Sequence, residues 1–182
     1  MRHVKPSVVR LSAAMLMTGL LVACSTTEMQ SAGKPGVSLD PKQGVYIVVP
    51  QDPADPDYAG SGKYMANTLA ELIAKRGVSI GIGTENATPD ENLAAAKKQG
   101  AGYLIVSIIT DWQHHYTDIA PVGKANSAGF TMTVIKVADG STVRSDDLTK
   151  RGTHISFAGG GDPKDQMKSA METYVDSLYP DN

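Results

Sequence analysis

The chain has 182 residues, of which 41% are hydrophobic, with a formal net charge of −2 and a single cysteine. That length is enough for one domain with a substantial core. One cysteine excludes a disulfide within the chain, and the weakly acidic balance argues against binding to nucleic acid or to anionic lipid headgroups.

The first 23 residues have the features of a signal peptide. Arg2, Lys5 and Arg10 precede an uncharged apolar run over 11–23, which ends at a small residue. A basic start, a short apolar run and a small-residue cleavage site are typical of a secretory signal. The run is shorter than the ~20 apolar residues that a spanning helix needs. We therefore expect cleavage, and no transmembrane helix in the mature chain.

The sequence LVAC over 21–24 resembles the lipobox of bacterial lipoproteins. The resemblance implies that the Cys24 thiol is alkylated with diacylglycerol, that the chain is cut before it, and that the new amine is acylated, for example with palmitate. Two or more acyl chains, at ~0.8 kcal/mol per buried CH₂, hold a protein durably on a bilayer. Ser25 stands where lipoproteins retained at the inner membrane tend to have aspartate, which implies the periplasmic face of the outer membrane. The alternative is an ordinary signal peptide whose cleavage leaves a free thiol.

Residues 24–43 are predicted to be a flexible tether, because they are rich in Ser, Thr, Gly and Pro and have no sustained apolar period. Loss of residues 1–23 removes three basic residues and no acidic one, which leaves a mature net charge of −5. Residues 44–182 are predicted to form a single periplasmic domain.

The first half of this domain is predicted to alternate strands and helices. An apolar run over 45–50 indicates a buried strand. Ser61 is the expected cap of a helix over 62–76, in which apolar residues recur on one face. A short run over 78–82 indicates a second strand.

A second helix is predicted from Thr88, which forms a capping box with Glu91, to a stop at Gly100. The apolar, β-branched run over 103–110 then indicates a central strand buried on both faces. Two further strands, over 130–135 and 141–149, are predicted to form a hairpin through the Asp-Gly turn at 139–140.

A last helix is predicted between Asp162, which caps it, and Pro180, which ends it. The elements therefore follow the order β-α-β-α-β-β-β-α. This order predicts an α/β fold, an α+β sandwich in which helices pack on a mixed sheet, with parallel strands first and an antiparallel meander later.

The segments GVYIVVP, ANTLAELIAKRG and ENLAAAKKQGAGYLIVSIITDW, with the meander and the final helix, resemble an uncharacterised family of small proteobacterial lipoproteins. More distantly, they are similar to the α/β domain of the curli-secretion lipoprotein, the Tol translocation protein and the lipoprotein activators of peptidoglycan synthases. The resemblance implies a periplasmic domain that contacts other proteins.

The glycine-rich segment AGSGKY over 59–64 lies between a strand and a helix, as a phosphate-binding loop would. That motif needs a glycine five residues before the second one and Ser or Thr after the lysine, but Asp57 and Tyr64 hold these positions. Asp52 and Asp55 would also repel a triphosphate. An ordinary helix N-terminus is therefore the favoured interpretation, and no cofactor is expected.

The densest group of functional side chains is DWQHHYTD over 111–118. Trp112, His114, His115 and Tyr116 are the candidates for a partner-binding surface. The alternative is a metal- or small-ligand-binding lipoprotein that uses this cluster, with His114, His115 and Asp118 as ligands for Zn²⁺ or Cu²⁺. The third interpretation is a solvated strand end with Trp112 packed on the sheet.

No catalytic residue is predicted, and the chain is not expected to be an enzyme. It has no G-x-S-x-G elbow, and its one cysteine is assigned to lipid. Asp146 and Asp147 are interpreted as solvated charge, because neighbouring side chains in a strand diverge. We therefore expect a non-catalytic protein-interaction or assembly module of the cell envelope, attached to a membrane through Cys24.

Overall fold

The computed structural model describes residues 26–31, 37–55, 58–113, 127–151 and 162–180. The helices and strands within these ranges are β1 (Thr26–Ser31), β2 (Gly44–Ile47), α1 (Ser61–Ala74), β3 (Ile80–Ile82), α2 (Pro89–Lys98), β4 (Ala101–Gln113), β5 (Ser127–Lys136), β6 (Thr142–Arg151) and α3 (Pro163–Leu178).

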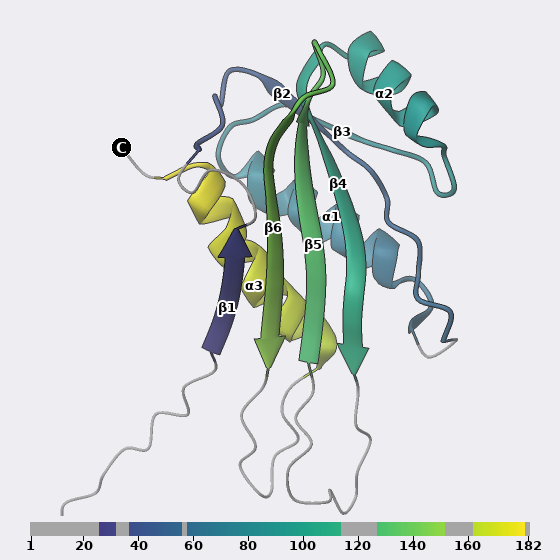
Figure 1. Cartoon of the computed structure of the whole chain (residues 1–182), viewed down its shortest axis with the longest axis vertical. Helices are drawn as coiled ribbons and strands as arrows, with labels where there is room; N and C mark the ends of the chain where they lie inside the picture. Colours follow the sequence, from purple (N-terminus) through teal and green to yellow (C-terminus); the bar gives the residue numbers. More distant parts are fainter. Residues whose placement is uncertain (1–25, 32–36, 56–57, 114–126, 152–161, 181–182) are drawn as a thin grey trace, which may run out of the picture.

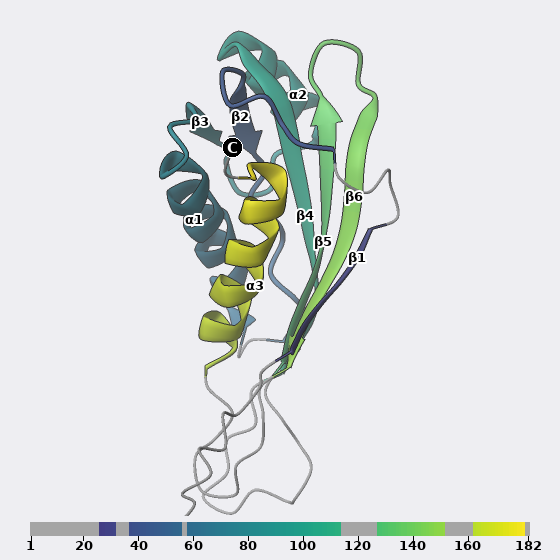
Figure 2. The same ribbon diagram turned by 90° about the vertical axis from the view of Figure 1, so that its left-hand side faces the viewer.

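The strands form one mixed sheet in the order β1-β6-β5-β4-β2-β3 (Figure 1). Strand β2 pairs in parallel with β3 and β4, whereas β4, β5, β6 and β1 pair antiparallel. Helices α1 and α3 lie side by side on one face of the sheet (Figure 2), and α2 packs on the other face. The predicted fold class and element order are confirmed from β2 to α3.

The core is divided by the sheet into two parts. Tyr46 and Ile47 are neighbours in β2 and point to opposite faces, as strand geometry requires. Ile47 belongs to the larger core under α1 and α3, which also contains Phe130 and Tyr174. Tyr46 belongs to a small core under α2. No helix in the described ranges is long and apolar enough to cross a bilayer.

Beyond the reach of α2, no helix of the described ranges covers the central strands on the second face of the sheet, and Figure 1 shows β4, β5 and β6 in front of α1 and α3. We call this surface the front face. Its members alternate along their strands with the core residues and lie opposite one another in the ladder; they are Ile108, Thr131, Thr133, Ser145 and Asp147.

The local signals at helix ends and turns are confirmed. The Thr88 hydroxyl accepts from the Glu91 amide, and the Glu91 carboxylate accepts from the Thr88 amide, at 3.3 and 2.7 Å. Asp162 accepts a hydrogen bond in the first turn of α3. The hairpin turns at Gly140, whose φ of 73° favours glycine, and the Asp139 carboxylate accepts from the Ser141 amide just before β6.

Strand β1 was not predicted, because its residues were assigned to the flexible tether. It pairs with β6 along its whole length, from Thr26 opposite Arg151 to Ser31 opposite Asp146. Leu39 is also buried, and its amide donates to the carbonyl of Leu178 at 2.9 Å. The strand was missed because backbone pairing does not require a periodic pattern of apolar residues. It pairs because β6 would otherwise expose a row of unpaired amides and carbonyls at the edge of the sheet. The tether prediction is therefore wrong for these segments.

Candidate functional site

The candidate site is a cleft of about 410 Å³ at the carboxyl ends of β2 and β3. The chain leaves β2 for α1 on one face of the sheet and leaves β3 for α2 on the other face. Such a reversal opens a crevice at the strand ends, which is where open α/β sheets bind ligands. The lining residues come from both loops and from the start of α1; they are Val49, Pro50, Gln51, Asp52, Gly60, Lys63, Glu85 and Asn86.

One wall of the cleft is the N-terminus of α1, which is held by Asp52. Its carboxylate accepts from the amides of Gly60 and Gly62 at 2.6 and 2.7 Å, and from the Ser61 hydroxyl at 3.3 Å. The prediction that Ser61 caps this helix is wrong: the cap position is Gly60, at φ 80°, and the capping carboxylate comes from the preceding loop. The amides that would bind a phosphate already have an anion from the chain itself.

The pKa of the Asp52 carboxyl lies below its ordinary value of 3.8 in the folded chain. Partial burial raises this pKa, but the hydrogen bonds from Gly62, Gly60 and Ser61 together lower it further than burial raises it. Because the folded pKa is depressed, the stabilising contribution is complete above the unfolded pKa and is lost as the pH falls through the folded pKa.

We expect Asp52→Ala to lower the free energy of unfolding by about 1 kcal/mol at neutral pH, as the loss of a helix cap does. This difference should hold above the unfolded pKa and shrink as the pH falls through the depressed folded pKa, where the wild-type carboxyl becomes protonated. Urea denaturation at a series of pH values measures it. Asp52→Asn is the matched control, since its amide keeps one acceptor and does not titrate. A difference that persists unchanged at pH 2 would contradict the assignment.

The rim of the cleft has mixed charge. Lys63 Nζ lies 4.0 Å from a carboxylate oxygen of Glu85, and both side chains are mostly exposed, so this pair contributes about 0–1 kcal/mol. Asn86 has a left-handed backbone, with φ 62°. The cleft offers carboxylate, amide and ammonium groups. All four histidines of the chain and its cysteine lie outside the described residues, so no imidazole or thiol is placed beside these groups.

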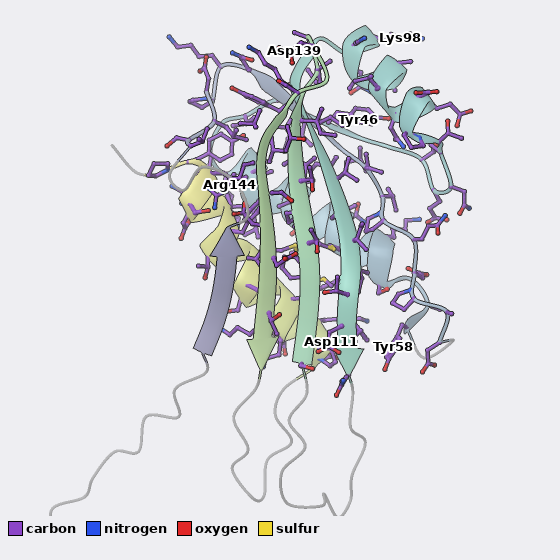
Figure 3. All side chains as sticks on the ribbon, in the orientation of Figure 1. Tyr46, Tyr58, Lys98, Asp111, Asp139 and Arg144 are labelled. Atoms are coloured by element: carbon purple, nitrogen blue, oxygen red, sulfur yellow. The ribbon has the colours of Figure 1, made fainter. Side chains whose placement is uncertain are left out.

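Of the predicted partner-binding residues, only Trp112 lies in the described part of the chain. Strand β4 continues three residues past its predicted end at 110, and Trp112 falls within this extension. The indole is 7% exposed and belongs to the larger core, where it meets Tyr58 edge-on at a centroid distance of 6.4 Å. The ring therefore packs on the sheet and is not displayed at the surface. Figure 3 places Tyr58 and Asp111 at this end of the sheet.

The other residues of that cluster, His114, His115, Tyr116 and Asp118, lie outside the described ranges, as does Cys24. Among the residues that are described, no group of three His, Cys, Asp or Glu side chains could hold a metal ion. The partner surface and the metal site at these positions therefore stay predictions.

The sequence interpretation missed a buried ion pair on β6. Asp146, expected to be solvated, has no exposed surface, and its carboxylate binds the Nε of Arg144, which is 2% exposed. Asp147 is exposed, as expected, and accepts from the Thr131 hydroxyl at 2.6 Å. The available signal was the period of two: Arg144, Asp146 and Leu148 alternate on one side of the strand, and that side faces the core.

Comparison with solved structures finds proteins that share this fold. A structure described as the PelC dodecamer from Paraburkholderia phytofirmans matches 86% of this chain and 100% of that chain, with 17% identity and a TM-score of 0.66. A substituted form of the same dodecamer matches 85% and 98%, with 20% identity and a TM-score of 0.59. Lipoprotein GNA1162 from Neisseria meningitidis matches 73% and 97%, with 11% identity and a TM-score of 0.48.

None of the curated proteins is significantly similar to the chain. The expectation of an uncharacterised family is confirmed, whereas the finer likeness to the curli, Tol and synthase-activator domains stays a prediction. The family described as Domain of unknown function (DUF4823) matches residues 37–178, from before the first strand of the α/β domain to the end of α3. The chain therefore belongs to the DUF4823 family.

Proposed function

We propose that the chain is a lipoprotein held at the periplasmic face of the outer membrane by lipid on Cys24, and that its α/β domain is a non-catalytic assembly module. The basic start, the apolar run and the LVAC sequence support the anchor. The chemistry of the cleft supports a role without catalysis, because the Asp52 carboxylate is used to hold α1 and Glu85 faces Lys63.

The observation that carries the assembly role is the exposed side chain of Ile108, which is 60% accessible in the middle of the front face. The hydroxyls beside it are already paired across the strands. Thr131 donates to Asp147 at 2.6 Å, and Thr133 and Ser145 lie 3.0 Å apart. The hydroxyls of Thr131, Thr133 and Ser145 are thus occupied, and the exposed Ile108 side chain, near the Asp147 carboxylate, is the apolar group that can pack against another protein surface.

The partner that we assign to this face is a second copy of the chain. PelC, whose fold the chain shares, is described as a dodecamer. The edge strand β3 supplies a second, different surface, where Ile82 is 41% exposed and the strand contains neither proline nor lysine to block pairing. Two unlike surfaces on one chain permit head-to-tail contacts, which close into rings when the rotation between copies allows it.

The mature chain, prepared as Cys24→Ser without lipid, is expected to self-associate in a concentration-dependent way in sedimentation equilibrium. Ile108→Asp should weaken this association at least tenfold, because a contact of about 2 kcal/mol is replaced by a carboxylate that must be desolvated. Thr142→Asp, which adds the same charge at the exposed start of β6, is the control and should associate like the parent.

A mature chain that stays monomeric at every concentration would contradict self-assembly. Photocrosslinking from position 108 in intact cells provides the second measurement. Repeated capture of a second copy of the chain supports the proposal. Repeated capture of one different envelope protein would show that this protein, and not a second copy, is the partner of the front face.

A further inference from the structure

Strand β1 begins only two residues after the proposed anchor. Thr26 is the first residue of β1, and consecutive Cα atoms are ~3.8 Å apart, so the Cα of Cys24 lies within about 8 Å of the sheet. A free tether over 24–43 would instead allow a separation of roughly 60–70 Å at ~3.3–3.6 Å per residue. With β1 paired, the lipid and the sheet therefore cannot be far apart.

The register of the sheet shows which of its ends is nearest to Cys24. Thr26 lies opposite Arg151, the last residue of β6. Arg151 lies opposite Ser127, the first residue of β5, and Ser127 lies opposite Gln113, the last residue of β4. These four residues form one row, which we call the anchor end; it is the lower end in Figure 1. The far end carries α2 and the β5–β6 hairpin, where Figure 3 labels Lys98 and Asp139.

We propose that lipid on Cys24 holds the anchor end against the headgroup layer of the bilayer, with the strands steep to the membrane and the far end projecting from it. The inference rests on the proposed lipid anchor and adds an orientation to it. Strand β4 has 13 residues, so at ~3.3 Å per residue the two ends differ in height by about 40 Å.

The described side chains at the anchor end are compatible with a headgroup layer. Gln113 is exposed and uncharged, the Ser127 hydroxyl donates to Asp111 at 2.5 Å, and the buried Lys150 ammonium donates to Ser169 at 2.9 Å. In this orientation the front face and β3 both point sideways, toward other copies anchored in the same membrane.

The orientation is tested with the full acylated protein in phosphatidylcholine vesicles that contain a small fraction of headgroup-labelled acceptor lipid. Cys24 is blocked by its thioether, so a donor dye can be attached through Gln113→Cys at the anchor end or Lys98→Cys at the far end; both positions are exposed. Energy transfer to the acceptor lipid should be several-fold more efficient from position 113 than from position 98.

Unpairing β1 should remove this difference. Successive residues of a strand direct their amides to opposite sides, so replacing both Glu28 and Met29 by proline deletes at least one ladder donor. The double alanine replacement at the same positions is the matched control and should keep the difference.

The outcomes separate the orientation from the anchor. Equal transfer from positions 113 and 98, in protein that floats with the vesicles, would overturn the orientation and leave the anchor intact. Transfer that is stronger from position 98 would do the same. If Cys24→Ala floated with the vesicles as well as the parent does, or if the native product carried an unmodified thiol, the proposed lipid anchor would be contradicted. The orientation, which rests on that anchor, would then be contradicted as well.

Discussion

Replacement of Asp146 by alanine is expected to lower the free energy of unfolding by about 3–5 kcal/mol, the usual consequence of removing one partner of a buried ion pair. Arg144 would keep its charge in a site where only 2% of the residue is exposed, and its Nε would lose the carboxylate that accepts from it. Guanidinium chloride denaturation of the mature chain with Cys24→Ser measures the change as a lower midpoint.

The position of Arg144 explains why the effect should be large. Its other guanidinium nitrogens donate to the Ser177 hydroxyl at 2.9 Å and to the Ser177 carbonyl at 3.3 Å, and the group lies 5.5 Å from the centre of the Tyr174 ring. Both residues belong to the last turns of α3, where a cation is favoured by the exposed carbonyls. The pair therefore connects β6 to the end of α3.

Two controls identify burial as the cause. Asp147→Ala, one residue along β6, removes an exposed carboxylate that accepts from Thr131, and should cost less than about 1 kcal/mol. The double replacement Arg144→Met with Asp146→Leu should cost less than Asp146→Ala alone, because no unpaired charge stays behind. A loss below about 1 kcal/mol for Asp146→Ala would contradict this account.

The elements that the sequence predicts well depend on contacts between near neighbours in the chain. The Thr88–Glu91 capping box and the turn at Gly140 each involve residues within a few positions of one another. The apolar runs of β2 and β4 are likewise continuous. Such signals are complete within one short segment, so no knowledge of the tertiary structure is needed to interpret them.

The features that were missed depend on residues brought together by folding. The carboxylate of Asp52 reaches Gly62 across ten positions, and β1 pairs with a strand more than 100 residues later. Asp146 has polar neighbours in sequence but is covered by α3. In each case the local composition predicts a solvent-exposed segment. In the folded chain, a segment distant in the sequence supplies a hydrogen-bonding or packing partner instead.

The same distinction applies to the candidate site. The AGSGKY segment was correctly interpreted as a helix N-terminus. The phosphate-loop motif is a short sequence pattern, and Asp57 and Tyr64 already depart from it within that pattern. The cleft itself could not be predicted, since its walls come from the loops after β2 and β3, and their meeting follows from crossovers on opposite faces of the sheet. The position of Trp112 in the core depended on the length of β4, which the run over 103–110 underestimated.

Replacement of Gly62 by alanine should destabilise the domain, although alanine is about 1 kcal/mol better than glycine within a helix. A Cβ at this position would overlap the carbonyl oxygen of Pro50 and lie 3.0 Å from its carbonyl carbon and 3.1 Å from an Asp52 carboxylate oxygen. The overlapping atoms of Pro50 belong to the backbone of the cleft wall, so they cannot rotate away as the end of a flexible side chain would. The start of α1 must therefore move.

Overpacking of this kind costs about 1–3 kcal/mol and occasionally more. The displacement also stretches the hydrogen bond from the Gly62 amide to Asp52, now 2.7 Å, so the two losses should outweigh the helix propensity and leave a net cost of about 2 kcal/mol.

Denaturation midpoints compare Gly62→Ala with Gly60→Asn, a control two residues earlier. An added Cβ there meets nothing within 4 Å, and asparagine tolerates the left-handed φ of 80°, so the control should cost less than about 1 kcal/mol. A Gly62→Ala protein as stable as the parent would show that α1 can move away from Pro50 freely, and that Asp52 does not fix the start of this helix.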